Sequence, residues 1–139
     1  MPGFDFALVE EWIGLVAEAH HRTVGSLSYI FCNDDYILDV NRQFLQHDYY
    51  TDIITFDYCC GKMLRGDLVI SLDTVASNAV LQHADYDTEL YRVVIHGVLH
   101  LCGINDKGPG EREIMERHED EALAMLEGLL EKRRASIGQ

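Results

Sequence analysis

The chain has 139 residues, of which 47% are hydrophobic, and it carries a formal net charge of -13 at pH 7. This length and hydrophobic content fit one compact domain, which we assign to residues 1–139. Such a negative charge excludes a general nucleic-acid-binding protein, because those proteins carry a basic face that displaces counterions from phosphates. Any contact with RNA must therefore be local.

The sequence also lacks the patterns of membrane and secreted proteins. It contains neither a long apolar run nor a charged start followed by an apolar stretch and a small-residue cleavage site. Its four cysteines form no C-x-x-C pair, which is typical of a reducing compartment. We therefore expect a cytoplasmic protein with neither a membrane span nor a signal peptide.

Helical and strand patterns alternate in the first half of the chain. Apolar residues at helical spacing predict helices over residues 6–21 and 35–46. Aromatic and β-branched residues predict a strand over residues 27–32. Two further strands, 51–58 and 66–71, are close enough in sequence to form an antiparallel pair.

The second half of the chain is predicted to be helical. Asp73 can cap a third helix that runs to about residue 84, and Asp87 or Thr88 begins a fourth helix. Pro109 suits the first turn of a last helix over residues 110–133, whose apolar residues are expected to face inward: Ile114, Met115, Ala122, Leu126 and Leu129. Three strands and five helices in this mixed order predict an α+β fold, an α/β layer in which helices cover a small mixed sheet.

A possible metal site lies on the fourth predicted helix. His96 and His100 are four residues apart, so both imidazoles can reach one ion from the same helical face. Gly103 suits a helix end, and the turn after it could bring Asp106 to the same ion as a third ligand. Two helical histidines can also be an ordinary partly buried pair, but the Gly and Asp that follow favour a metal.

The spacing H-x-x-x-H-x-x-G-x-x-D matches the long zinc-binding motif of metzincin proteases, with one difference. The residue after the first histidine is Gly97, where those proteases have the glutamate that acts as general base. A peptidase function is therefore disfavoured. Gly97 also permits close approach to the helix, either beside the metal or by a neighbouring element.

A small basic segment lies between the two paired strands. From Tyr58 to Gly66 the sequence contains Lys62 and Arg65 and no carboxylate between them. This hairpin is a positive segment on an acidic protein and could contact RNA phosphates. The alternative is an ordinary solvated turn.

Three sequence blocks together resemble the YbeY family, the zinc-dependent endoribonucleases of bacterial rRNA maturation. They are His96–Gly103, the segment Thr51–Phe56 that follows Asn41, and Gly66–Ser71. The resemblance implies a cytoplasmic metal hydrolase that cuts single-stranded RNA, matures the 3′ end of small-subunit rRNA and helps to discard defective ribosomes. It also implies one more strand pairing, so that the expected sheet has about four strands packed against about five helices.

Two positions depart from the family pattern. The family motif usually ends in a third histidine, and that position here is Asp106, whose carboxylate can bind zinc but acidifies a bound water less than a neutral imidazole. The family commonly has a catalytic arginine four residues after Asn41, where this chain has Leu45. The nearby His47 and Asp48 could supply a proton acceptor or donor, or they could be turn formers.

The prediction is thus a single-domain endoribonuclease in which His96, His100 and Asp106 hold one Zn²⁺ with an open coordination position. Such an ion can polarise a phosphoryl oxygen and activate water. Lys62, Arg65 and Lys107 are candidates for contacts to the phosphates of single-stranded rRNA, and the expected partners are the small ribosomal subunit and its assembly factors. The alternative is a non-catalytic ribosome-assembly factor whose metal is structural.

Overall fold

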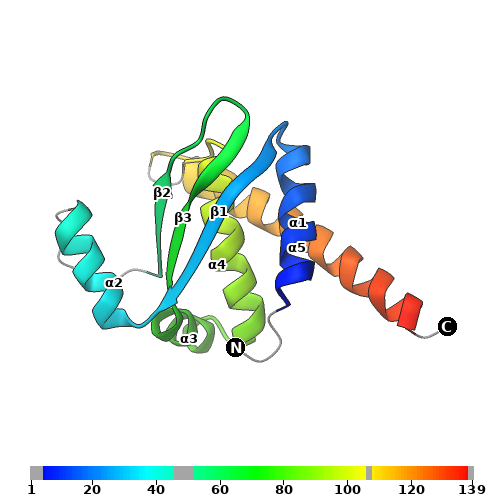
Figure 1. Ribbon diagram of the computed structural model, residues 1–139. Coiled ribbons are helices and arrows are strands. Elements are labelled where there is room, and N and C mark those ends of the chain that lie inside the picture. The colour runs from blue at the N-terminus through cyan, green and yellow to red at the C-terminus, as the bar shows by residue number, and fades with distance from the viewer. Residues whose placement is uncertain (1–4, 46–51, 106–107, 138–139) are drawn as a thin grey trace.

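The computed structural model of the protein describes residues 5–45, 52–105 and 108–137 (Figure 1). These residues form an α+β fold, as predicted. The elements in chain order are α1 (Phe6–Ala19), β1 (Thr23–Cys32), α2 (Asp34–Val40), the π-helical turn η1 (Asn41–Leu45), β2 (Ile53–Asp57), β3 (Met63–Ser71), α3 (Leu72–Leu81), α4 (Tyr86–Leu101) and α5 (Glu111–Ile137).

The sheet of the described residues has three strands in the order β1-β3-β2, so the expected number of about four is too high. β2 and β3 form the predicted antiparallel pair, in which Ile54 lies opposite Val69. β1 pairs in parallel with β3, and Tyr29 lies opposite Leu68. β1 begins at Thr23, four residues before the predicted start, and a register shift separates its two halves between Val24 and Leu27.

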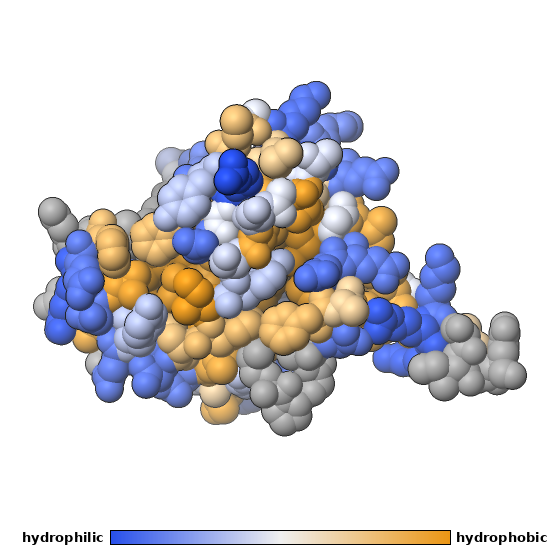
Figure 2. Space-filling view, viewed as in Figure 1, coloured by the Kyte–Doolittle hydropathy of each residue, from blue (hydrophilic) through white to orange (hydrophobic). Residues whose placement is uncertain are grey.

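The two faces of the sheet are covered differently. α1, α4 and α5 build the main hydrophobic core on one face, and α2 packs on the other face over a smaller cluster around Ile37 and Val69 (Figure 1). Figure 2 shows hydrophilic side chains on α2 and towards the end of α5, with apolar side chains between them over the sheet. Among the described residues, no helix combines the length and the apolar character that a membrane span requires.

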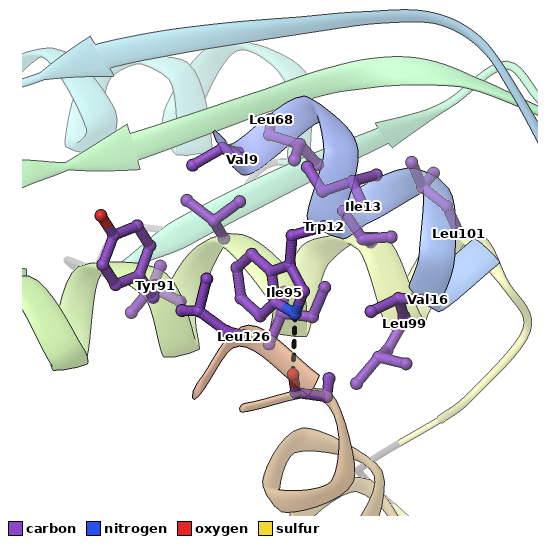
Figure 3. Packing of buried hydrophobic residues seen from close by; sticks show 14 of the residues in the cluster. Val9, Trp12, Ile13, Val16, Leu68, Tyr91, Ile95, Leu99, Leu101 and Leu126 are labelled. Carbon is purple, nitrogen blue, oxygen red and sulfur yellow. Dashed lines mark hydrogen bonds between the residues drawn. The ribbon is translucent and has the colours of Figure 1, made fainter. Parts of the chain in front are cut away.

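Trp12 joins the helices of the main core (Figure 3). Its indole is fully buried, packs edge-on against Tyr91 of α4, and donates a 2.7 Å hydrogen bond from Nε1 to the carbonyl oxygen of Ala122 in α5. A buried indole N–H needs such a partner, because leaving it without an acceptor would cost free energy. The bond therefore fixes α5 against α1 and α4.

The helix predicted to carry the histidines packs directly on the sheet. A Cβ on Gly97 would lie 2.7 Å from Cδ1 of Ile53 and 2.9 Å from Cδ2 of Leu68, closer than real Cβ contacts. The close approach that glycine permits here is therefore made by the strands β2 and β3. α4 therefore lies against β2, the strand formed by most of the segment from Thr51 to Phe56.

The end of α4 follows the prediction for Gly103. This residue has a positive φ of 93°, the N–H of Gly103 donates to the carbonyl of His100, and the N–H of Ile104 donates to the carbonyl of Leu99. These two bonds form a Schellman motif, which ends a helix and reverses the chain. Asp106 itself lies outside the described residues.

The last helix corrects one predicted position. Met115, Ala122 and Leu126 are buried in the core as expected, but Ile114 is 43% exposed. The inward face of α5 instead includes Glu119, which is only 6% exposed. A charged residue therefore occupies a position on an otherwise apolar face.

Candidate functional site

The two histidines of α4 direct their rings to the same place. Nε2 of His96 lies 3.0 Å from Nε2 of His100, and the ring centroids are 4.5 Å apart at a nearly perpendicular angle. Their four-residue spacing puts one imidazole above the other on the helix face. The prediction that both side chains point to one site is therefore confirmed by the geometry.

A carboxylate from α5 holds the other side of the first ring. Oε2 of Glu119 lies 2.6 Å from Nδ1 of His96, and Oε1 of Glu119 lies 3.1 Å from Nη1 of Arg92. Arg92 and His96 are also four residues apart, so one face of α4 presents a guanidinium and an imidazole to the same carboxylate. This chain of three polar groups connects α4 and α5 beside the core.

The sequence analysis did not identify Glu119. The available signal was its position: Met115, Glu119, Ala122 and Leu126 are spaced as one helix face, and three of the four are apolar core residues. A buried carboxylate on such a face requires a polar partner inside the protein. Arg92 and His96 are those partners.

A polar cavity of about 650 Å³ opens next to His96. Its walls come from α3, α4, α5 and the residue before β2, and they are lined by Asp52, Asn78, Gln82, Glu89, Arg92, Val93, His96, Arg112, Met115, Glu116, Glu119 and Asp120. Five of these side chains are carboxylates and two are arginines. The cavity is therefore acidic overall.

Burial affects two of these carboxylates. It raises the pKa of Asp52 above the ordinary value, and the nearby His96 opposes that shift. Burial likewise raises the pKa of Glu89, and here Arg92 opposes it. Both carboxylates thus stand in a partly desolvated environment, in which an additional anion would be disfavoured.

The predicted RNA-contacting hairpin lies outside this cavity. Lys62 is exposed in the connection between β2 and β3, Arg65 is exposed near the start of β3, and neither lines the cavity. Sγ of Cys59, at the base of this segment, lies 3.8 Å from the carbonyl oxygen of Leu101. The hairpin therefore contacts the C-terminal end of α4, at the residue that follows His100.

Four of the predicted site residues lie outside the described residues: His47, Asp48, Asp106 and Lys107. Within residues 5–45, 52–105 and 108–137, no three His, Cys, Asp or Glu side chains are grouped closely enough to hold a metal ion. His96 and His100 are thus two candidate ligands of a site whose predicted third ligand is not described. Cys102, two residues beyond His100, is buried in the main core.

The two histidines fit a metal in two respects. Two nitrogen ligands of a tetrahedral zinc, each at about 2.0–2.1 Å from the ion, are roughly 3.3 Å apart. The 3.0 Å between the two Nε2 atoms is close to that separation. The carboxylate on Nδ1 of His96 also matches the partner that metal-bound histidines usually have.

Comparison with known proteins shows extensive similarity. The family model described as "Endoribonuclease YbeY" matches residues 6–127. A relative from Parabacteroides distasonis named Endoribonuclease YbeY is 62% identical over 126 residues, which cover 91% of this chain and 89% of the relative. A protein of the same name from Phocaeicola vulgatus is 67% identical over 115 residues, which cover 83% of each chain.

A solved structure has a similar fold. The solution structure of TM1509 from Thermotoga maritima superimposes with a TM-score of 0.66 at 25% sequence identity. The match covers 94% of this chain and 89% of that one. The arrangement of helices and strands described above is therefore also found in that protein.

Proposed function

This chain belongs to the YbeY family of endoribonucleases, and from that membership we propose that it cuts single-stranded RNA at a metal centre on α4. The observation that carries the proposal is the pair of Nε2 atoms 3.0 Å apart at the edge of an acidic cavity. The proposed substrate is rRNA, cut during maturation of the 3′ end of the small-subunit rRNA. The location proposed with this activity is the cytoplasm, and the proposed partners are the small ribosomal subunit and its assembly factors.

The proposed cofactor is one Zn²⁺, held by His96, His100 and Asp106. When bound, the ion supplies Lewis-acid polarisation of a phosphoryl oxygen and activation of water. His96 and His100 contribute neutral imidazole nitrogens, which suit zinc, and Asp106 contributes an oxygen that reduces the net charge of the centre. Gly97 supports a nuclease over a peptidase, because no glutamate stands next to His96 to act as general base.

The charges around the cavity determine how RNA is expected to lie. The acidic cavity wall disfavours the phosphate backbone, so the backbone is expected to pass on the side of the exposed hairpin. There Lys62 and Arg65 are the proposed phosphate contacts, and Lys107 is proposed as a third phosphate contact. His47 and Asp48 are proposed to accept and donate protons at the scissile phosphate, in the region where the family commonly has an arginine.

A second function follows from the same features. A ribosome-assembly factor that binds RNA or protein and uses its metal only structurally would also have an acidic surface and no catalytic arginine at Leu45. The formal net charge of -13 favours this alternative, because a protein that binds nucleic acid over a wide surface carries a basic face. It differs from the first proposal in one measurable property, the cleavage of RNA.

The deciding experiment combines metal analysis with an RNA cleavage assay. Protein stripped with a chelator is incubated with an end-labelled single-stranded RNA, with and without added zinc, and a duplex of the same sequence serves as substrate control. We expect cleavage of the single strand only after zinc is restored. Zinc binding without cleavage would support the assembly factor, and cleavage that persists without metal would contradict the proposed centre.

A matched variant identifies the site of the metal. His100→Ala is expected to abolish both zinc binding and cleavage. His118→Ala is the control, because His118 is a partly buried histidine on α5 whose ring packs against His20 and lines no part of the cavity. Equal loss in both variants would show that the activity depends on the fold and not on the α4 histidines.

A further inference from the structure

The carboxylate of Glu119 contacts a ring nitrogen of His96 and can therefore determine which nitrogen carries the proton. Its Oε2 lies 2.6 Å from Nδ1 of His96, a short distance typical of a hydrogen bond that involves a charged group. A carboxylate can only accept, so the proton of this bond belongs to Nδ1. A neutral His96 then carries no proton on Nε2.

The second contact of His96 agrees with this assignment. Nε2 of His96 and Nε2 of His100 are 3.0 Å apart, and a hydrogen bond between them requires one donor and one acceptor. With its proton on Nδ1, His96 is the acceptor, and its Nε2 lone pair is directed at the point between the two rings. A metal ligand must present its lone pair in this way.

Arg92 restricts the carboxylate from the other side. Its Nη1 lies 3.1 Å from Oε1 of Glu119, while Oε2 faces the imidazole. The side chain of Glu119 is only 8% exposed, so water does not compete freely for either oxygen. Each oxygen therefore has its own partner, and the carboxylate cannot rotate without losing both.

We propose that Glu119 is a positioning residue of the metal centre: it fixes the Nδ1-protonated tautomer and the orientation of His96, and Arg92 holds that carboxylate in place. This inference rests on the proposed metal-dependent function, to which it adds a residue 23 positions from His96 on a different helix. Partners of this kind on metal-bound histidines typically change metal affinity by about 10–100-fold when they are removed.

The competing interpretation is a purely structural ion pair that fastens α5 to α4. The chain offers a matched control, because Asp120 also pairs with Arg92, at 3.4 Å, and its side chain is 69% exposed. Asp120→Ala removes a carboxylate from the same guanidinium while the bond between Glu119 and His96 stays. Glu119→Gln keeps the size of the side chain and an oxygen that can accept from Nδ1.

The first measurement needs no metal. Nitrogen-15 NMR of the histidine rings in the metal-free protein reports which nitrogen carries the proton, with His96→Ala used to assign the signals. We expect the Nδ1-protonated form of His96 in the wild type, in Asp120→Ala and in Glu119→Gln, and a mixture of tautomers in Glu119→Ala. A wild type with the proton on Nε2, or an unchanged tautomer in Glu119→Ala, would overturn the proposal.

The second measurement is a zinc titration of the same proteins, with circular dichroism to establish that each is folded. Glu119→Ala is expected to bind zinc about 10–100-fold more weakly than the wild type, and Asp120→Ala within about twofold of it. The zinc affinity of Glu119→Gln is expected to lie between those of Glu119→Ala and Asp120→Ala. If Glu119→Ala does not fold, Glu119→Gln still tests the proposal. If the wild type, Glu119→Gln and Glu119→Ala all bind zinc with equal affinity, Glu119 is only a structural ion pair.

The two measurements separate this inference from the function on which it rests. A wild type that binds no zinc would overturn the proposed centre, and the tautomer of His96 in Glu119→Ala would still decide what Glu119 does. A wild type that binds zinc and cuts RNA, with no effect of Glu119→Ala on tautomer or affinity, would leave the function intact and overturn the role of Glu119.

Discussion

Among the described residues, two pairs of histidines pack ring against ring, and the pairs differ in how their nitrogens are arranged. In the first pair, His96 and His100 have centroids 4.5 Å apart and Nε2 atoms 3.0 Å apart, with a buried carboxylate on Nδ1 of His96. In the second pair, the centroids of His20 and His118 are 5.0 Å apart. The rings are thus almost equally close in both pairs.

The second pair lacks the polar arrangement of the first. Oε2 of Glu121 lies 3.6 Å from Nδ1 of His118, and the side chain of Glu121 is 64% exposed. Within the described residues, Nδ1 of His118 is a buried atom without a hydrogen-bond partner. Close rings alone therefore do not make a ligand site, since two nitrogens must also converge and be held by a partner.

The largest difference between the two pairs is expected in RNA cleavage, measured after one ring is removed from each pair. His96→Ala is expected to lower the cleavage rate about a thousandfold, because a bound metal contributes several kcal/mol to the transition state. His20→Ala is expected to leave the rate within about twofold. Comparable losses in the two variants, measured on protein of equal folded fraction, would contradict the distinction between the pairs.

The next largest effect concerns the residue that is expected to complete the first pair. Asp106→Ala should weaken zinc binding about tenfold or more, and Asp106→His should retain affinity while it shifts the pH profile of cleavage downward, because a negative charge is lost near the ion. Calorimetric titration of the wild type and both variants measures this. Equal affinities for all three proteins would exclude Asp106 from the site.

A smaller effect is expected from the hairpin beyond the first pair. Replacing both Lys62 and Arg65 by Ala should weaken RNA binding and reduce its salt dependence by about one to two phosphate contacts. The matched control is the double variant Lys132→Ala with Arg134→Ala, which removes two exposed basic residues near the end of α5. An unchanged salt dependence in the hairpin variant would make the hairpin an ordinary solvated turn.

The smallest effect is expected from the second pair, and it concerns stability and not activity. Burial lowers the pKa of His20 below its ordinary value of 6.5, as do the positive charges of His118, Arg22 and His21, while Glu121 opposes the shift. Below about pH 6.5 the unfolded chain therefore binds more protons at this position than the folded protein, and the free energy of unfolding falls.

Urea unfolding at several pH values between about 7.5 and 5.5 measures that loss. His20→Gln should lose less stability than the wild type over this range, because glutamine does not titrate. The difference between the two proteins isolates His20 from the carboxylates, which both proteins share. Identical pH dependence would show that His20 does not titrate differently in the folded state.

Much of the fold was predictable because its signals are local. Apolar spacing identified α1, and Gly103 marked the end of α4, where a positive φ of 93° favours a residue without a Cβ. The parallel pairing of β1 with β3 was not predictable from spacing, because it joins residues about 40 positions apart. The extra strand implied by the family resemblance is not part of the sheet formed by the described residues.

The site residues also divide into those that local spacing predicts and those that it does not. His96 and His100 follow from the geometry of one helix, so the sequence was sufficient to predict that their rings meet. Glu119 comes from another helix. Because α5 contains many acidic residues, the presence of a glutamate at this position is not by itself a signal of a functional site. Only its position on the apolar face, beside Met115 and Ala122, distinguishes it from the solvated carboxylates around it.

The most direct test counts the zinc that each pair of histidines holds. Wild type, the double variant His96→Ala with His100→Ala, and the double variant His20→Ala with His118→Ala are loaded with zinc and dialysed, and bound metal is measured per chain. We expect one zinc in the wild type and in the His20 and His118 variant, and none in the His96 and His100 variant. Retention of zinc by a folded His96 and His100 variant would contradict the metal centre on α4.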